Sequence, residues 1–255
     1  MPKPDHRHQR LENYRKTGFW IEQSCFSLVE VERMRAETER LWASLDFSQD
    51  HNWVHWRNHE TKGRIADRLD PVRFNSEYFG ELCVAPAVKG LAEDLLGGSV
   101  FVLKDKLVRK EPQTSGYGVH QDLPYWDEIG IDGDEILTAT IAIDAATEEH
   151  GPLMLYPGLH DRILPGAPDN PLDVDRHALE ETSPFIAVTG PGDVVFFHSR
   201  TPHGSAANRA STPRRVYHVT YARDHGNSEE IIARYHAQIE HKHGVHRRVD
   251  ETAPS

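Results

Sequence analysis

The order of helical and extended patterns along the chain is the feature that most constrains its fold. Up to residue 98 the longer apolar patterns recur at helical spacing; beyond it, short apolar segments alternate with glycine and proline turns. Six of these segments are predicted strands: 100–110, 137–145, 153–156, 185–188, 193–198 and 214–223. Helices followed by strands favour an α+β chain with a double-stranded β-helix (jelly-roll, cupin-like) core at about residues 100–223, within a single domain over 1–255.

Helices are expected on both sides of the strand-rich part. Ser27 and Glu30 have the spacing of a capping box, and apolar residues then recur at helical spacing to about Leu45. Residues 78–96 predict one or two further helices that end at Gly97 and Gly98. Further expectations are a short strand at 18–26, a closing helix at 229–241, a loosely held polar segment at 1–16, and a polar and aromatic stretch without clear periodicity at 47–75.

The charge balance excludes several classes of partner. The chain has 29 Lys and Arg against 40 Asp and Glu, a net charge of −11, which argues against nucleic acid and against an anionic membrane surface. Cys25 and Cys83 are too few for a disulfide framework, so a reduced, cytoplasmic setting is expected. The sequence has no apolar run that suits a signal peptide or a membrane span.

A histidine and an aspartate two residues apart form the first candidate metal pair. In an extended segment, residues i and i+2 point to the same side, so His120 and Asp122 can reach one ion while Gln121 points elsewhere. Seventeen histidines make a chance pair easy to find, and a structural histidine beside a turn-capping aspartate is the alternative. The pair therefore needs support from elsewhere in the chain.

That support comes from a second histidine 83 residues downstream. His203 is followed by Gly-Ser, and Arg214 lies eleven residues beyond it. Two histidines and one carboxylate are the ligands of the facial triad that holds non-haem Fe(II) with open positions. An arginine presents a planar donor fork that matches a carboxylate. His198 competes for the third ligand position, but it lacks the Gly-Ser that follows His203.

Three runs carry a family resemblance in combination. They are the His-Gln-Asp of 120–122, EHGPLMLYPGLH at 149–160, and GPGDVVFFHSRTPHGSAANRASTPRR at 190–215. Together they resemble the phytanoyl-CoA dioxygenase family of Fe(II)/2-oxoglutarate oxygenases, over about Phe101 to Ala222. The resemblance implies that His120, Asp122 and His203 bind iron.

The resemblance also implies how the co-substrate is held. Arg214 would pair with the distal carboxylate of 2-oxoglutarate, and Ser205 would hydrogen-bond the same group. Strand parity puts Arg214 on the smaller, more polar face of its strand. Thr140 and Lys106 fall where the family contacts the co-substrate, although a solvated strand lysine is the alternative for Lys106. Gln121 is expected to reach the co-substrate from just outside the ligand set.

Substrate contacts are expected in the loop that follows Asp122. Tyr125 and Trp126 are candidates there, and the acidic residues up to Glu135 would favour a cationic or polyhydroxylated ligand. A solvated acidic loop is the alternative. Trp56, with its neighbours Trp53 and Arg57, is a further candidate, and packing in the core is the alternative for it.

The implied reaction is oxidation of a C–H bond with Fe(II), 2-oxoglutarate and O₂, giving succinate, CO₂ and a hydroxylated or ring-closed product. Asp122 favours this chemistry over halogenation, because related iron halogenases carry a small residue in place of the carboxylate. The expected substrate is a small polar molecule in natural-product biosynthesis, such as an amino sugar or an amino-acid derivative. A catalytically silent jelly-roll binding or sensor protein and a cupin-type hydrolase or isomerase remain alternatives. The oligomeric state is left open.

Overall fold

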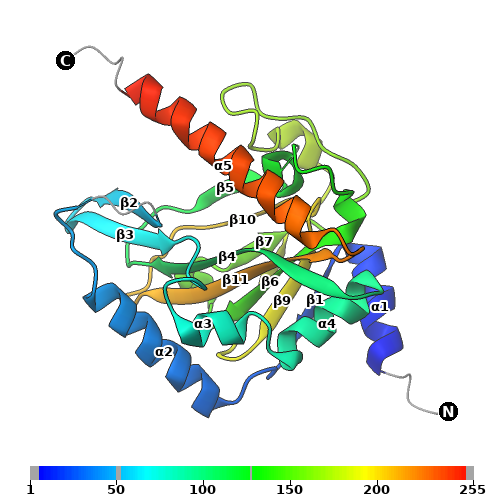
Figure 1. Ribbon diagram of the computed structural model, residues 1–255, viewed down its shortest axis with the longest axis horizontal. Coiled ribbons are helices and arrows are strands. Elements are labelled where there is room, and N and C mark those ends of the chain that lie inside the picture. The colour runs from blue at the N-terminus through cyan, green and yellow to red at the C-terminus, as the bar shows by residue number, and fades with distance from the viewer. Residues whose placement is uncertain (1–5, 50–52, 127, 251–255) are drawn as a thin grey trace.

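The computed structural model describes residues 6–49, 53–126 and 128–250, with side chains up to residue 239. Two antiparallel β-sheets face one another, and helices cover the outer side of the larger sheet (Figure 1). The helices are α1 (His6–Thr17), α2 (Leu28–Ala43), α3 (Glu77–Leu82), α4 (Pro86–Leu96) and α5 (Ser228–Asp250), with 3-10 turns η1 (Leu123–Trp126), η2 (Gly133–Glu135), η3 (Glu148–His150) and η4 (Arg176–Leu179).

Seven strands form the large sheet and four form the small one. In spatial order the large sheet contains β1 (Phe19–Glu22), β9 (Val194–His198), β6 (Ile136–Ala142), β11 (Arg214–Arg223), β4 (Val100–Lys110), β3 (Gly63–Leu69) and β2 (Val54–His59). The small sheet contains β5 (Tyr117–His120), β10 (His203–Ser205), β7 (Leu153–Leu155) and β8 (Phe185–Ala187). Neighbouring strands that are far apart in sequence bring distant residues together across both sheets.

The main hydrophobic core lies between the large sheet and helices α2 to α4. Val31 and Met34 of α2 and Phe79 of α3 are fully buried there against Tyr217 and Tyr221 of β11. The opposite face of the same sheet packs against the small sheet through a second cluster that includes Phe197 and Leu155. Each strand of the large sheet therefore sends alternate residues to a helix-covered face and to an inner face.

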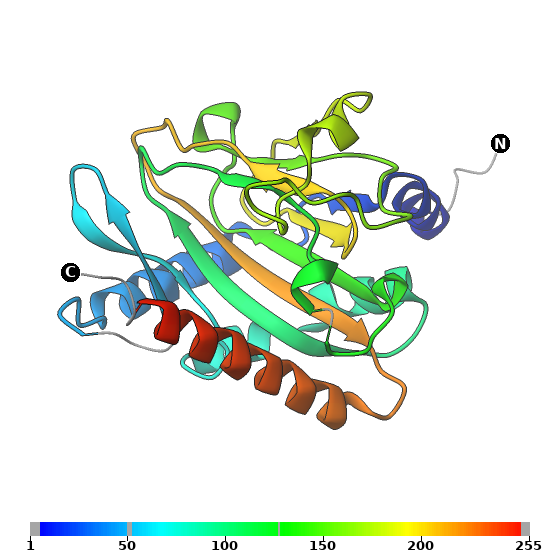
Figure 2. The same ribbon diagram turned by 90° about the horizontal axis from the view of Figure 1, so that it is seen from above.

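Helix α5 closes one side of the molecule. It runs alongside the large sheet, where it contacts β4 (Figure 2). Ile231 and Tyr235 of this helix pack on Leu103 of β4 and on Trp126. Among the described residues, none of the helices has both the length and the apolar character that a membrane crossing requires.

The predicted antiparallel β part with flanking helices is confirmed. All six strands predicted after residue 98 are present, and α2 begins with the capping box in which Ser27 and Glu30 bond reciprocally. α4 ends at Gly97, whose φ of 73° is a left-handed conformation that favours glycine. Four parts of the fold were not predicted: α1, in the segment that was expected to be loosely held, the β2–β3 hairpin, and the two short strands β5 and β10.

Candidate metal centre and its cavity

Two short strands of the small sheet bring the candidate metal ligands together. β5 ends at His120 and β10 begins at His203, and the antiparallel register pairs these two residues directly. Their ring centroids are 4.3 Å apart. Asp122 follows at the beginning of the next turn, and one potential ligand atom from each of the three residues lies within 4.8 Å of the others. The three predicted ligands thus converge in the structure.

Backbone hydrogen bonds orient both imidazole rings. Nδ1 of His120 lies 2.9 Å from the carbonyl oxygen of Gly118, and Nδ1 of His203 lies 2.9 Å from that of Thr201. A carbonyl can only accept, so Nδ1 carries the proton in each neutral ring and Nε2 keeps a free lone pair. The two Nε2 atoms lie 3.8 and 3.9 Å from Oδ1 of Asp122. The three free donor atoms therefore face one another.

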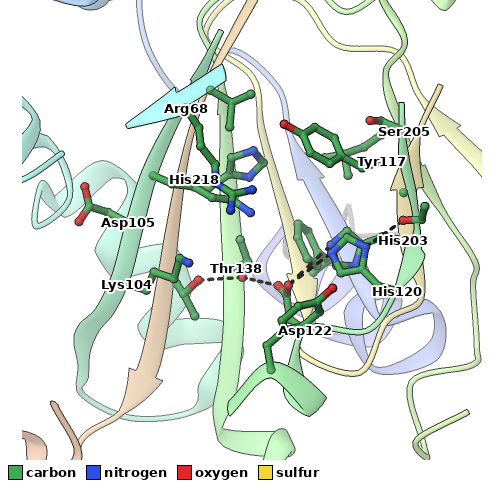
Figure 3. A pocket seen from close by; sticks show the side chains of 18 of the residues that line it. Arg68, Lys104, Asp105, Tyr117, His120, Asp122, Thr138, His203, Ser205 and His218 are labelled. Carbon is green, nitrogen blue, oxygen red and sulfur yellow. Dashed lines mark hydrogen bonds and ion pairs between the residues drawn. The ribbon is translucent and has the colours of Figure 1, made fainter. Parts of the chain in front are cut away.

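A threonine holds the other oxygen of Asp122. The hydroxyl of Thr138 donates to Oδ2 at 3.1 Å, and it also lies 3.1 Å from the hydroxyl of Thr220 (Figure 3). Burial opposes ionisation of Asp122, but the neighbouring imidazoles, Lys106 and the Thr138 hydroxyl outweigh it, so the pKa of Asp122 lies below its usual range. Burial, followed by His120, lowers the pKa of His203 to about 4. An ionised carboxylate and a neutral imidazole are the forms that bind a metal ion.

A pair of buried cations lies on the inner face of the large sheet. Arg214 and Lys110 are cross-strand partners on β11 and β4. Both are buried, and Nε of Arg214 has no hydrogen-bond partner. The ammonium of Lys110 donates to the hydroxyl of Ser205 at 3.0 Å and to the carbonyl of Ala206. In the described part of the chain, no carboxylate pairs with either cation.

Burial of these two cations changes their proton affinities. It lowers the pKa of Arg214 to about 10. Burial and the charge of Arg214 together lower the pKa of Lys110 to about 7. Two adjacent buried cations without a counter-ion are unfavourable unless an anion binds between them. This end of the site is therefore suited to a carboxylate.

The three potential ligands and Arg214 open into one cavity of about 320 Å³. Figure 3 shows His120 and His203 side by side on one wall, with Arg68, Lys104 and His218 on the wall opposite. Other residues that line the cavity are Lys106, Tyr117, Tyr125, Trp126, Thr138, Asp173, Gly204, Ser205 and Thr220. This volume is near the lower end of the range for small-molecule sites, which is about 300–1,000 Å³.

Of the residues expected to contact the co-substrate, some line the cavity and others do not. Ser205, Arg214 and Lys106 line the cavity. Thr140 is outside the lining and contacts Nδ1 of His218 at 2.8 Å, so it acts on the cavity only through that ring. Gln121 points away from the cavity, because His120 and Asp122 on either side of it point in. Its amide donates to the carbonyls of Arg162 and Arg200 and accepts from the amide of Leu164, so the expectation of a co-substrate contact is corrected.

Two of the three expected substrate contacts line the cavity. Tyr125 lies edge-on to His120, with ring centroids 5.7 Å apart, and Trp126 is buried beside α5. Trp56 is elsewhere: its ring packs against Phe47 and under the guanidinium of Arg64, so its expected role is corrected to packing. Nothing in the lining of the cavity comes from Trp56.

The acidic loop does not form the expected rim of the cavity. Asp132 and Asp134 make ion pairs with Arg200, and Asp134 also pairs with His198. Glu135 pairs with His225 at 2.7 Å. None of these three carboxylates lines the cavity, and Asp127 of the same loop lies outside the described residues. Glu128 does not line the cavity either, so the described acids of the loop do not form the predicted rim, and three of them bind basic side chains outside the cavity.

Sequence reasoning missed Arg68 and Thr138, which line the cavity, and Lys110, which lies behind the lining residue Ser205. Lys110 meets Ser205 and Arg214, Thr138 supports Asp122, and Arg68 enters from a hairpin that was not predicted. Lys110 shares a face of its strand with Lys106, which was the only available signal for it. The pairing that brings it to Arg214 depends on register between strands about a hundred residues apart.

Comparisons with known proteins agree with this site. The family model described as phytanoyl-CoA dioxygenase (PhyH) matches residues 14–216. A methylphosphonate hydroxylase from Gimesia maris is 28% identical over 83% of this chain and 79% of its own length. A 2-aminoethylphosphonate dioxygenase from an uncultured bacterium is 32% identical over 64% of this chain and 62% of its own.

A solved structure supports the same assignment at the level of the fold. The crystal structure of EctD from S. alaskensis with 2-oxoglutarate and 5-hydroxyectoine superposes with a TM-score of 0.72 at 19% identity, covering 88% of this chain and 79% of that one. The match of the family model extends over most of the chain, and a His-Asp-His set is in place. The chain therefore belongs to the phytanoyl-CoA dioxygenase family and is a non-haem Fe(II)/2-oxoglutarate-dependent dioxygenase.

Proposed function

We propose that this chain oxidises a C–H bond of a small polar molecule, by hydroxylation or oxidative ring closure, in a single domain built on a double-stranded β-helix core at about residues 100–223. His120, Asp122 and His203 hold Fe(II) in this proposal, and Arg214 with Ser205 and Lys110 holds the distal carboxylate of 2-oxoglutarate. The observation that carries it is the shared cavity, which has three converging donor atoms at one place and the buried Arg214 at another, with Lys110 beside Arg214 and no carboxylate paired with either cation among the described residues.

The residues present fit the iron. Two imidazole nitrogens with free lone pairs and one carboxylate oxygen are a donor set that suits Fe(II) and leaves positions for other ligands. When bound, Fe(II) with 2-oxoglutarate and O₂ supplies an oxidant able to break a C–H bond, with succinate and CO₂ as by-products. The presence of Asp122 favours oxygen transfer over halogenation.

The protein's own groups supply position and shielding. The guanidinium of Arg214 and the ammonium of Lys110 fix one end of the co-substrate, since each is held by strand pairing and burial. The Thr138 hydroxyl occupies one oxygen of Asp122 and leaves the other free for the metal. Trp126 and α5 cover the neighbouring side of the cavity, which limits access of water.

The size of the cavity supports a small substrate. About 320 Å³ must hold both the co-substrate and the reacting part of the substrate, which disfavours a coenzyme A thioester enclosed in full. Relatives named for methylphosphonate, 2-aminoethylphosphonate, ectoine and L-proline agree with a small polar or ionic substrate. The expectation of an amino sugar rested partly on an acidic rim, which the described acids do not form. A role in natural-product biosynthesis stays a prediction.

An anaerobic titration tests the proposal directly. Fe(II) and 2-oxoglutarate added together to the protein should give a visible charge-transfer band, and O₂ should then convert 2-oxoglutarate to succinate. Asp122→Ala should lose the band, while Asp161→Ala, at an exposed aspartate outside the cavity, should keep it. Absence of the band in the unmodified protein would favour a silent binding protein. Hydrolase or isomerase activity with Zn²⁺ that survives Arg214→Ala would favour a cupin-type enzyme.

A further inference from the structure

Besides Arg214 and Lys110, three basic side chains lie on one wall of the cavity, among them Lys106, for which the sequence suggested a co-substrate contact. Arg68 of β3 and Lys104 and Lys106 of β4 line the cavity, opposite His120 and His203 (Figure 3 labels Arg68 and Lys104). We call these three residues the basic wall. This positive charge is unexpected in a chain of net charge −11, and it favours an anionic ligand, whereas the acidic loop suggested a cationic one.

Within the part of the chain that the structure describes, two of the three charges lack a counter-ion. Lys104 pairs with Asp70 at 2.8 Å. Among the described residues, Arg68 has only a long contact of 3.4 Å to Nδ1 of His55, and its buried Nε has no partner there. Lys106 has no hydrogen bond or ion pair with any described residue. The basic wall therefore presents about two uncompensated positive charges to the cavity.

The carboxylates that line the same cavity do not neutralise the wall. Asp105 points away from it and accepts bonds from the amides of Val72 and Arg73. Asp173 lies against Gly118 of β5, in the small sheet. Asp122 is committed to the metal ligand set. A buried cation without a partner is costly, so the wall is built for an anion that comes from outside the protein.

The two lysines of the basic wall lie apart from the cations assigned to the co-substrate's distal carboxylate. Lys106 and Lys110 share a face of β4 but are four residues apart, about 13 Å along a strand. In the sheet register, Lys110 pairs with Arg214, whereas Lys104 pairs with Thr220, which contacts the Thr138 that supports Asp122. Lys104 thus lies level with the metal ligands, Lys106 pairs with His218, and Arg68 pairs with Val108, between Lys106 and Lys110. The wall therefore begins at the metal ligands, where a substrate must sit to react, and extends toward the co-substrate end.

Resting on the proposed function, we propose that the basic wall binds the anionic head of the substrate, and that this substrate is a compact organic dianion of the phosphonate class. The Arg68 guanidinium and the Lys106 ammonium bind the oxygens of this anionic head. Lys104, which is paired with Asp70, contributes further positive charge. A doubly charged tetrahedral head matches two uncompensated cations, whereas a planar monoanion leaves one of them unpaired. The carbon attached to the head then faces the metal ligands.

Calorimetry on the anaerobic enzyme loaded with Fe(II) and 2-oxoglutarate tests this inference, with methylphosphonate as the probe. Methanesulfonate has the same shape with one charge less, and dimethyl sulfone is a neutral relative. We expect methylphosphonate to bind most tightly, methanesulfonate at least about tenfold more weakly, and the sulfone not measurably. Binding beside the metal should also shift the charge-transfer band, which gives a second readout.

Matched variants assign the binding to the wall. Arg68→Gln should weaken the binding of methylphosphonate at least about tenfold, and it should leave the charge-transfer band formed with Fe(II) and 2-oxoglutarate unchanged. Arg64→Gln removes an arginine of the same strand that stacks on Trp56 outside the cavity, and it should leave both unchanged. Lys106→Gln should behave as Arg68→Gln does.

The outcomes separate this inference from the proposed function. If the band forms but methylphosphonate does not bind, or binds no better than dimethyl sulfone, the inference is wrong and the proposed function stands. If Arg68→Gln binds methylphosphonate as the unmodified protein does, or if Lys106→Gln loses only 2-oxoglutarate, the wall does not hold the substrate. Absence of the band in the unmodified protein overturns both.

Discussion

Two neighbouring arginines of β11 face opposite sides of the large sheet and have opposite surroundings. On the helix-covered side, Arg215 binds Asp144 through two nitrogens, at 2.6 and 3.0 Å, and Glu39 at 2.8 Å. On the inner side, Arg214 is buried with no ion pair to any described residue and with an unpartnered Nε. Arg215 therefore stabilises the fold on one face, whereas Arg214 is available to bind an anionic ligand on the other.

The tyrosines of the same strand extend this contrast. Tyr217 and Tyr221 are fully buried on the helix side, and their hydroxyls donate to the carbonyls of Phe79 and Cys83 at 3.1 and 2.7 Å. On the inner side, burial keeps His218 neutral by lowering its pKa well below the usual range. Satisfied polar groups stabilise the helix side, whereas partly satisfied ones define the cavity. Substitutions on the two faces should therefore affect different measurements.

Loss of a metal ligand should have the largest effect on the cavity side. His203→Ala removes one of three donors, and the affinity for Fe(II) should fall by more than about a hundredfold, because losing even an outer partner of a ligand costs about 10–100-fold. The free energy of unfolding should change by no more than about 1–2 kcal/mol. Metal titration and thermal unfolding measure the two quantities. Iron affinity equal to that of the unmodified protein would contradict the assignment.

The arginine pair should show the contrast most directly. Arg214→Met should lower the affinity for 2-oxoglutarate by about 10–100-fold, which is the loss expected for one charge-assisted bond of about 1.5–3 kcal/mol. It should not lower the free energy of unfolding. Arg215→Met should leave 2-oxoglutarate affinity unchanged and reduce the free energy of unfolding by about 1–3 kcal/mol, since Asp144 loses its partner. If Arg214→Met lowers the free energy of unfolding and Arg215→Met lowers the affinity for 2-oxoglutarate, the assignment of the two arginines to opposite faces is wrong.

The threonine behind Asp122 should have a smaller effect. Thr138→Val keeps the shape of the side chain but removes the hydroxyl that donates to Oδ2, so Fe(II) affinity should fall by about tenfold. Thr138→Ser keeps the donor and should restore most of the affinity. A Val variant that binds iron normally would show that the hydroxyl supports only packing against Thr220.

Local sequence rules predicted the parts of the fold that local physics determines. The capping box at Ser27, the stop at Gly97 and the alternation along β11 depend on residues a few positions apart, and the structure agrees with all three. The His-Gln-Asp parity also held: Gln121 points away from the cavity because its neighbours point in. The β2–β3 hairpin lacked a clear alternation, so it could not be recognised.

The rest of the site depends on long-range pairing that local patterns do not contain. Arg68 reaches the cavity because β3 pairs with β4, and Lys110 meets Arg214 because β4 pairs with β11. The sign of the charge near the metal was misjudged for the same reason. The acidic loop follows Asp122 in the sequence, but Asp132, Asp134 and Glu135 pair with basic residues away from the cavity.

The smallest expected effect is a pH dependence of co-substrate binding. Burial and Arg214 hold the pKa of Lys110 at about 7 in the free protein, and a bound carboxylate should raise it. Below about pH 7 the ammonium is charged in both states, so affinity should not change through this group. Above it, binding takes up a proton, and 2-oxoglutarate affinity should fall with pH by at most about tenfold per unit. Lys110→Met should bind more weakly at neutral pH and lose this slope. An equal slope in both proteins would place the titrating group elsewhere in the cavity.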